Sequence, residues 1–236
     1  MLYFPICLDL SGKTCIVIGG GQVAERKIFS LLECGARITV VSPELTDEVA
    51  ELATTGRINL LKRPYRDGDL QGSFLTIAAT DDPTVQQAVQ EEAERHNLLL
   101  NVADVPDRCN FILPATMRRG DLAISVSTGG KSPALARQIK KELEERFDPA
   151  YAIYNDLLGA ARPFVLLQSH NHQENKKIFN SLLHLEMINW IQQGQWDKIK
   201  NHFAKILGQK TAEECLKEVL KPENTSAAAT KKLLES

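Results

Sequence analysis

Three small residues at fixed spacing give this sequence its clearest chemical signal. Gly19, Gly21 and Ala24 follow an apolar, β-branched run at residues 14–18 and open a segment with helical spacing. In such a strand–turn–helix unit the first glycine permits a tight turn, the second admits a pyrophosphate, and the alanine allows close packing. The free N–H groups at the helix start favour bound phosphates. The pattern predicts a dinucleotide site, and its alternative is a tight turn that binds nothing.

The expected second strand, residues 37–41, does not end in the acid that usually binds the adenosine ribose. In most dinucleotide sites an Asp or Glu closes this strand and hydrogen-bonds the ribose hydroxyls. Here Ser42, Pro43 and Glu44 follow the strand. Ser42 can bond a ribose or a phosphate, and Glu44 can reach back towards the same place. The local chemistry therefore leaves both NAD and NADP open.

Two polar segments further along the chain are candidates for contact with a second ligand. Asp104 follows the expected fifth strand, residues 98–102, and is either a functional carboxylate or a loop cap. Residues 128–131, Thr-Gly-Gly-Lys, precede a helix that Ser132 caps and Pro133 begins. They predict an anion cradle, against the alternative of a plain glycine turn. The basic side chains around it suit a polyanionic small molecule or form a solvated face: Arg118, Arg119, Lys131, Arg137, Lys140 and Lys141.

Strands and helices alternate through the N-terminal half of the sequence and would position these candidates. Strands are expected at residues 14–18, 37–41, 58–62, 74–80 and 98–102. Helices are expected at residues 23–34, 46–54 and 83–97. Such alternation predicts a parallel, doubly wound α/β sheet, in which ligands bind at the carboxyl ends of the strands. Ser42, Ala79, Thr80 and residues 101–104 follow such ends.

The alternation stops after Asp104. A polar loop at residues 105–110 is expected to lead to short strands at 111–115 and 122–127, joined through residues 118–121 and followed by a helix at 133–147. From residue 148 only helices are expected, with Pro163 kinking one of them. Two amphipathic helices at 178–191 and 196–207 are separated by Gly194, and residues 223–236 have the composition of a frayed tail.

The composition is that of an ordinary globular protein. The 236 residues are 43% hydrophobic and 25% charged, with a net charge of −2, which gives no general attraction to nucleic acid or anionic membrane. No apolar run approaches the ~20 residues that span a bilayer, and the N-terminus lacks the pattern of a signal peptide. Five scattered cysteines, without Cys-x-x-Cys, indicate reduced thiols in a cytoplasmic protein.

Two further groups of polar residues have a structural interpretation. His170 and His172 alternate as metal ligands can, but they lack nearby cysteines, so a solvated loop between helices is expected. No metal site is predicted. Asp107 directly precedes Arg108, and the sequence favours an ion pair between them on a surface loop.

Six motifs stand in order along the chain: Gly-Gly-Gly-Gln-Val-Ala-Glu-Arg-Lys at 19–27, Val-Val-Ser-Pro at 40–43, Ala-Ala-Thr-Asp-Asp at 78–82, Asn-Val-Ala-Asp at 101–104, Cys-Asn-Phe at 109–111, and Ser-Thr-Gly-Gly-Lys-Ser-Pro at 127–133. Together they resemble the precorrin-2 dehydrogenase and sirohydrochlorin ferrochelatase family, which is also the N-terminal module of siroheme synthase. The match is tight over residues 1–150 and loose to about residue 210. This family also ends its second strand in Ser-Pro, without the ribose acid.

The resemblance implies NAD-dependent oxidation of precorrin-2, a tetrapyrrole, to sirohydrochlorin in siroheme biosynthesis. Some members also insert Fe²⁺ into the product, and the carboxylate at the position of Asp104 is needed for both steps. The implied architecture is a Rossmann-like NAD-binding domain at 1–113, a small α+β dimerisation segment at 114–149 that builds a homodimer, and a helical domain at 150–222. The implied cofactor-binding residues are Gly19, Gly21, Gln22, Val23, Ser42, Pro43, Ala79, Thr80, Asn101 and Val102. The implied substrate-binding residues are Asn110, Thr128, Gly129, Gly130 and Lys131.

The chain departs from the family pattern in two places. We expect no methyltransferase module after the helices, and uroporphyrinogen methylation to occur elsewhere. Thr128 stands where some relatives carry a serine that is phosphorylated. The rival interpretation is a non-catalytic dinucleotide-sensing module, like those that regulate potassium transport, but these usually carry the acid after the second strand.

Overall fold

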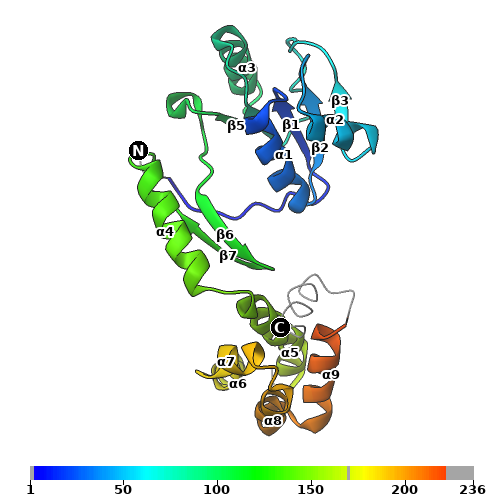
Figure 1. The fold of residues 1–236 in the computed structure, drawn as a ribbon, viewed down its shortest axis with the longest axis vertical. Coiled ribbons are helices and arrows are strands. Elements are labelled where there is room, and N and C mark those ends of the chain that lie inside the picture. The colour runs from blue at the N-terminus through cyan, green and yellow to red at the C-terminus, as the bar shows by residue number, and fades with distance from the viewer. Residues whose placement is uncertain (1–2, 169–170, 222–236) are drawn as a thin grey trace. The chain divides into compact units, whose positions relative to one another are not determined.

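The computed structural model describes residues 3–168 and 171–221. The chain divides into two compact units, residues 1–113 and 114–236. The first unit holds a parallel sheet, and the second holds a β-hairpin followed by helices (Figure 1). The further division of the second unit into a dimerisation segment and a helical domain stays a prediction.

The sheet of the first unit has five parallel strands in the order β3-β2-β1-β4-β5. The central strand has buried side chains on both faces, because helices cover both sides, as is usual for a parallel sheet. This confirms the predicted doubly wound fold. The strands are β1 (Thr14–Ile18), β2 (Arg37–Val41), β3 (Asn59–Leu61), β4 (Leu75–Ala78) and β5 (Leu99–Val102).

Three helices pack on this sheet, α1 (Gln22–Glu33), α2 (Asp47–Thr54) and α3 (Pro83–Arg95). Val17 shares a core with α1 and α2, whereas its neighbour Ile18 shares a second core with α3. Successive side chains of a strand point to opposite faces, so the continuous apolar run of β1 supplies both cores. Asp82 caps α3, which begins at Pro83, the first residue of the helix expected from the sequence.

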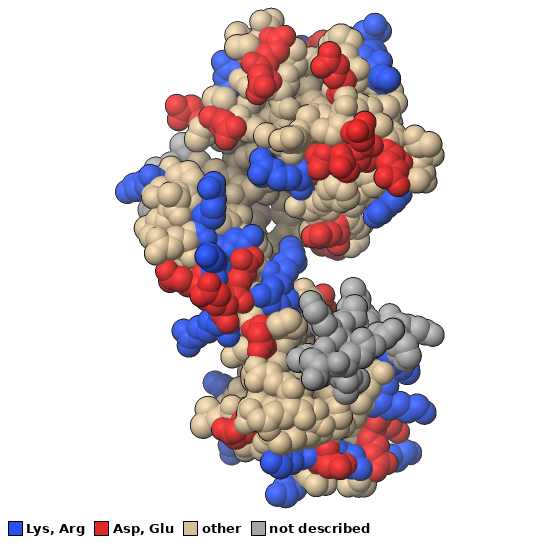
Figure 2. Space-filling view, in the orientation of Figure 1, with Lys and Arg blue, Asp and Glu red and all other residues tan. Residues whose placement is uncertain are grey.

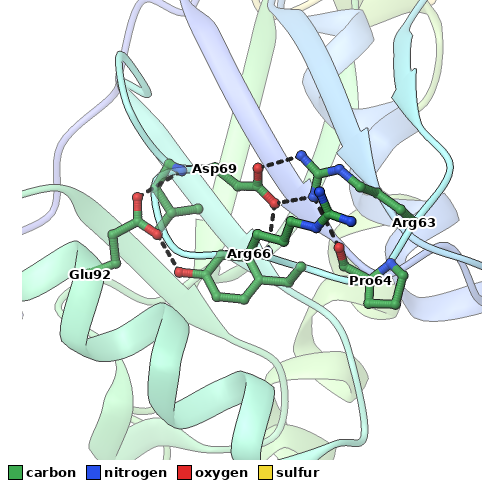
Figure 3. Close-up of polar contacts among 7 residues, drawn as sticks. Arg63, Pro64, Arg66, Asp69 and Glu92 are labelled. Atoms are coloured by element: carbon green, nitrogen blue, oxygen red, sulfur yellow. Dashed lines mark hydrogen bonds and ion pairs between the residues drawn. The ribbon is translucent and has the colours of Figure 1, made fainter.

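A buried carboxylate fastens the connection between β3 and β4 to α3 (Figure 3). Glu92 is fully buried and accepts hydrogen bonds from the Tyr65 hydroxyl and, at 2.9 Å, from the Leu70 N–H. Burial, followed by the contact with Glu92, raises the pKa of Tyr65. Arg63 and Asp69 close the same connection with two bonds of 2.7 Å. The segment after β3 is therefore a fixed part of this unit.

The second unit begins with a hairpin of β6 (Ala115–Arg119) and β7 (Leu122–Val126), on which α4 (Pro133–Arg146) packs. The strand predicted at 111–115 is wrong. Arg119 pairs with Leu122 across a two-residue turn, which places residues 118 and 119 in the strand and not in its loop. Phe111 instead packs against the core of the first unit.

The remaining described residues of the second unit form helices that share one apolar core. Its helices are α5 (Ala150–Gln168), α6 (His172–Leu182), α7 (Met187–Gln192), α8 (Trp196–Leu207) and α9 (Gln209–Val219). The single helix predicted at 178–191 is wrong. Leu182 and Met187 are both fully buried, and five positions apart on one helix they would face different sides, so the chain breaks between them. The His184 N–H there donates to the Tyr154 hydroxyl at 3.1 Å.

Helix α8 has the predicted bounds, and Gly194 precedes it as expected. Pro163 lies inside α5, which continues to Gln168. The predicted tail at 223–236 lies outside the described residues. No helix in the described part of the chain is long and apolar enough to cross a membrane.

Candidate active site

The turn after β1 contains three glycines with different surroundings. A Cβ on Gly19, whose φ is +110°, would lie 2.1 Å from the Ala79 carbonyl oxygen. A Cβ on Gly20 would lie 2.4 Å from the Glu44 carbonyl oxygen. A Cβ on Gly21 would meet no heavy atom of the described chain within 4 Å. The fold thus requires the first two glycines, whereas the space beside the third is open to a ligand.

Helix α1 starts directly at this open space. Gly21 is its N-cap, and no side chain in the described residues caps it. The first N–H groups of a helix have no partner within the helix, and their partial positive charge suits a phosphate. Gln22 is exposed and Val23 half-buried at this end. Together with the open space, this geometry fits the pyrophosphate of a dinucleotide.

The segment after β2 is fastened onto the glycine turn. Ser42 is buried, and its hydroxyl donates to the Glu44 carbonyl at 2.6 Å. The Ser42 N–H donates to the Leu61 carbonyl, and the Thr46 N–H donates to the Gly20 carbonyl at 2.9 Å. The proton of the Ser42 hydroxyl is therefore used inside the loop, and the oxygen can offer a ligand only a lone pair. Pro43 and Glu44 are exposed.

The end of β4 lies beside the glycine turn. The Ala79 N–H donates to the Ile18 carbonyl at 2.7 Å, which extends the pairing of β1 and β4. The Thr80 carbonyl accepts from the Gln86 side chain at 2.7 Å, and the Thr80 hydroxyl accepts from the Asp82 N–H. Ala79 and Thr80 are half-buried. Both residues lie at the carboxyl edge that the sequence predicts for the ligand.

Asp104 lies at the same edge of the sheet, directly after β5. The Ala103 N–H donates to the Ala78 carbonyl at 2.8 Å, so pairing with β4 continues up to this residue. Asp104 is exposed and has a φ of +60°, a left-handed conformation that few residues other than glycine adopt. On α1, burial lowers the pKa of Lys27, Arg26 adds to that effect, and Asp104 opposes it. The carboxylate of Asp104 therefore faces solvent, and its negative charge raises the pKa of Lys27 on α1.

Two predicted binding residues use their side chains to hold the protein together. The Asn101 amide donates to the Phe111 carbonyl at 3.1 Å. The Asn110 amide accepts from the Leu100 N–H at 2.8 Å and donates to the Leu98 carbonyl at 2.7 Å. Both amides tie residues 109–111 to β5. The ion pair predicted between Asp107 and Arg108 is replaced by bonds from Arg108 to Pro83 and Gln86.

The predicted anion cradle belongs to the second unit and is already partly hydrogen-bonded internally. The Thr128 hydroxyl accepts from the Ser132 N–H, and its carbonyl accepts from the Lys131 N–H, both at 3.1 Å. The Gly129 N–H donates to the Ser127 hydroxyl. Gly129 and Gly130 have φ values of +61° and +82°. The exposed Lys131 ammonium and the start of α4 remain for an anion.

The two arginines expected near this loop lie at the other end of the hairpin, beside its turn, and they differ from each other. The Arg119 guanidinium donates to the carbonyls of Phe147, at 2.7 Å, and Glu144, at 2.9 Å, and so caps the end of α4. Arg118 is exposed. Of these two arginines, Arg118 has its guanidinium exposed to solvent, whereas that of Arg119 is hydrogen-bonded to α4. The sequence alone does not distinguish the two roles.

The described residues contain no group of three or more His, Cys, Asp or Glu side chains that could hold a metal ion. His172 is the first residue of α6, and His170 lies outside the described residues. Sequence reasoning missed the tight packing at Gly20, the approach of Lys27 to Asp104, and the bonds of Cys109 beside β5. The run of three glycines was the one available signal for the first of these.

Comparison with known proteins covers both units. Residues 6–115 match the family model described as "Putative NAD(P)-binding", and residues 119–146 match the one described as "Sirohaem biosynthesis protein central". Siroheme synthase of Methylobacillus flagellatus is 42% identical over 147 residues, which are 62% of this chain and 32% of that protein. Siroheme synthase 1 of Aeromonas salmonicida is 38% identical over 183 residues, 78% of this chain and 39% of that protein.

A solved structure extends the similarity to the helices. The chain titled "SirC, precorrin-2 dehydrogenase" is 25% identical, with a TM-score of 0.70, and the match covers 92% of this chain and 98% of that one. The chain is therefore similar to a precorrin-2 dehydrogenase over nearly its whole length, and to siroheme synthases over its N-terminal part. It spans about a third of the length of the siroheme synthases that it matches. These matches confirm the Rossmann-like fold and NAD as the expected cofactor.

Proposed function

We propose that the chain oxidises precorrin-2 to sirohydrochlorin with NAD⁺, as a step of siroheme biosynthesis. The observation that carries this proposal is the position of Asp104, an exposed carboxylate held at a φ of +60° directly after β5. It lies at the sheet edge that also carries the open glycine turn, and ligands of doubly wound sheets bind at this edge. The similarity to a solved precorrin-2 dehydrogenase supports this reaction.

The glycine turn and its neighbours would hold the cofactor. The open space at Gly21 and the uncapped start of α1 fit the pyrophosphate. NAD⁺, when bound, accepts a hydride from the substrate. The other residues proposed to contact it are Gly19, Gln22, Val23, Ser42, Pro43, Ala79, Thr80, Asn101 and Val102.

Asp104 would serve as the catalytic base. Precorrin-2 loses two hydrogens on oxidation, one as the hydride and one as a proton. A carboxylate beside the macrocycle stabilises the positive charge that hydride loss leaves and accepts the proton. Insertion of Fe²⁺ into sirohydrochlorin releases two pyrrole protons, so the same base would serve a second, ferrochelatase activity with Fe²⁺ as substrate.

The carboxylates of the tetrapyrrole would need a local basic surface. The net charge is −2, and acidic and basic side chains are mixed over the face shown in Figure 2, so no general attraction is available. The proposed substrate contacts are Thr128, Gly129, Gly130 and Lys131, with the exposed guanidinium of Arg118. Asn110 is left out, because its amide is bonded to β5.

We also propose a cytoplasmic location and a homodimer. All five cysteines are free thiols, which a reducing compartment preserves. The homodimer is supported by the small number of buried side chains in β6, β7 and α4, which leaves these elements with an uncovered surface.

The test is anaerobic incubation with precorrin-2, with and without NAD⁺ and Fe²⁺, followed by absorbance spectroscopy. We expect the sirohydrochlorin spectrum only with NAD⁺, and the siroheme spectrum only when Fe²⁺ is added as well. An unchanged precorrin-2 spectrum in a protein that binds NAD⁺ would favour the sensing module instead.

A further inference from the structure

Residues 109–111 run beside β5 without forming a strand. The Asn110 N–H donates to the Leu100 carbonyl at 3.1 Å, and the Asn110 side chain bonds Leu98 and Leu100. The Asn101 side chain donates to the Phe111 carbonyl. This segment therefore supplies β5, an edge strand in the sheet order, with the partners that a further strand would provide.

The Cys109 sulfur lies against both ends of the turn that carries Asp104. It accepts from the Val102 N–H at 3.2 Å and lies 3.3 Å from the carbonyl oxygens of both Val102 and Val105. Asp104 is one of the two residues between these contacts. Burial raises the pKa of the Cys109 thiol, so at neutral pH it keeps the proton that it shares between the two carbonyls.

The conformation of Asp104 requires such support. A φ of +60° is unfavourable for a residue with a side chain and persists where the surroundings fix it. Within the described turn, the Val105 N–H reaches the Val102 carbonyl at a long 3.3 Å, which is a weak closure by itself. The thiol adds a donor and an acceptor at the same place.

We propose that Cys109 is a positioning residue for Asp104, whose turn it holds at both ends through its thiol while Asn110 ties the same segment to β5. The inference rests on the proposed function for the role of Asp104. It gives the Cys-Asn-Phe segment a mechanical part in the reaction, without contact to the substrate.

Three variants test the inference: Cys109→Ala, Cys109→Ser, and Cys34→Ala as the matched control. Ala removes every hydrogen bond of the thiol, and Ser keeps a donor and an acceptor. Cys34 is a partly buried cysteine of the same unit that ends α1. The measurements are kcat and KM for precorrin-2 oxidation, and hydrogen exchange at the Val102 and Val105 amides.

We expect kcat of Cys109→Ala to fall on the order of 10²-fold, the effect of a small misplacement of a reacting group, with KM for NAD⁺ unchanged. Exchange at both amides should become faster. Cys109→Ser should recover on the order of tenfold in kcat, as restored hydrogen bonds would give. Cys34→Ala should leave kcat and exchange as they are.

Unchanged exchange in a folded Cys109→Ala protein overturns the inference, and so does unchanged kcat when Asp104→Asn is inactive. If Asp104→Asn keeps near-normal turnover, the catalytic role proposed for Asp104 has failed, and the exchange at Val102 and Val105 alone decides whether Cys109 holds the turn. If Cys109→Ala does not fold, Asn110→Ala replaces it. A lower kcat of Asn110→Ala with unchanged KM for precorrin-2 supports the proposal that residues 109 and 110 hold the turn of Asp104, and any other result overturns it.

Discussion

At the scale of single residues, the proposal depends most on the charge of Asp104. Asp104→Asn keeps the shape and removes the base, so we expect turnover of precorrin-2 to fall by ~10²–10⁴-fold, the usual contribution of general-base catalysis. NAD⁺ binding should survive, because the glycine turn is untouched. The control is Asp107→Asn, an exposed carboxylate of the same loop. Near-normal turnover of Asp104→Asn would make Asp104 a loop residue without a catalytic part.

The adjacent glycines of the turn should respond differently to a methyl group. Gly21 has a φ of −81° and open space around its Cβ position, so Gly21→Ala should fold with an unchanged Tm. Its methyl would occupy the place of the pyrophosphate and weaken NAD⁺ binding at least ~10-fold, or ~1.4 kcal/mol. Gly20→Ala should lower the Tm, because its Cβ meets the Glu44 carbonyl. Calorimetric titration and thermal melting separate the two effects, and unchanged NAD⁺ affinity in Gly21→Ala would refute the assignment.

At the scale of elements, Glu92 should stabilise the first unit by joining α3 to the segment after β3. Glu92→Ala leaves the Tyr65 hydroxyl and the Leu70 N–H without their buried acceptor. Hydrogen bonds to a charged group contribute ~1.5–3 kcal/mol, so the free energy of unfolding should fall by about that amount. Glu91→Ala, at an exposed position of the same helix, is the control. Urea denaturation measures both, and equal losses would contradict the role of Glu92.

The same contact predicts a loss of stability in alkali. Burial and Glu92 raise the pKa of Tyr65 in the folded protein, whereas an unfolded tyrosine loses its proton near pH ~10. The unfolded state thus releases this proton first, so the contribution of Tyr65 is present below pH ~10 and is lost as the pH rises above it. Tyr65→Phe should reduce the fall in stability above pH ~10. The check is the difference in unfolding free energy between the two proteins at pH 8 and pH 11.

The elements that the sequence predicted well are those fixed by local pattern. The strand at 37–41 and the helix at 196–207 have their predicted bounds, because apolar periodicity and turn residues determine both. The start of β6 after Pro114 depends on the register of the hairpin. The break after Leu182 depends on the contact of His184 with Tyr154, two residues that lie far apart in the sequence. The place of Asp104 after a strand was likewise visible, whereas the Cys109 bonds that surround it form only in the folded chain.

At the scale of the molecule, the two units differ in how completely their elements are packed. The sheet has a core on each face, and the helices from α5 to α9 share a third. In β6, β7 and α4, only Met117 and Ala136 are buried. A two-stranded hairpin is marginal in water without a substantial covering surface. This part of the chain therefore has the least internal support for its observed structure.

A second copy of the chain would supply that cover, and Leu135 gives a way to test it. Leu135 lies in the first turn of α4 with 49% of its surface exposed. Leu135→Glu is compatible with the helix, since acids near a helix N-terminus are favourable, but an unpaired carboxylate in an interface costs several kcal/mol. By light scattering we expect the wild type to be a dimer and Leu135→Glu a monomer. Leu185→Glu, at a fully exposed leucine outside these elements, should stay dimeric. A monomeric wild type, or a Leu135→Glu protein that remains dimeric, would place the interface elsewhere or remove it.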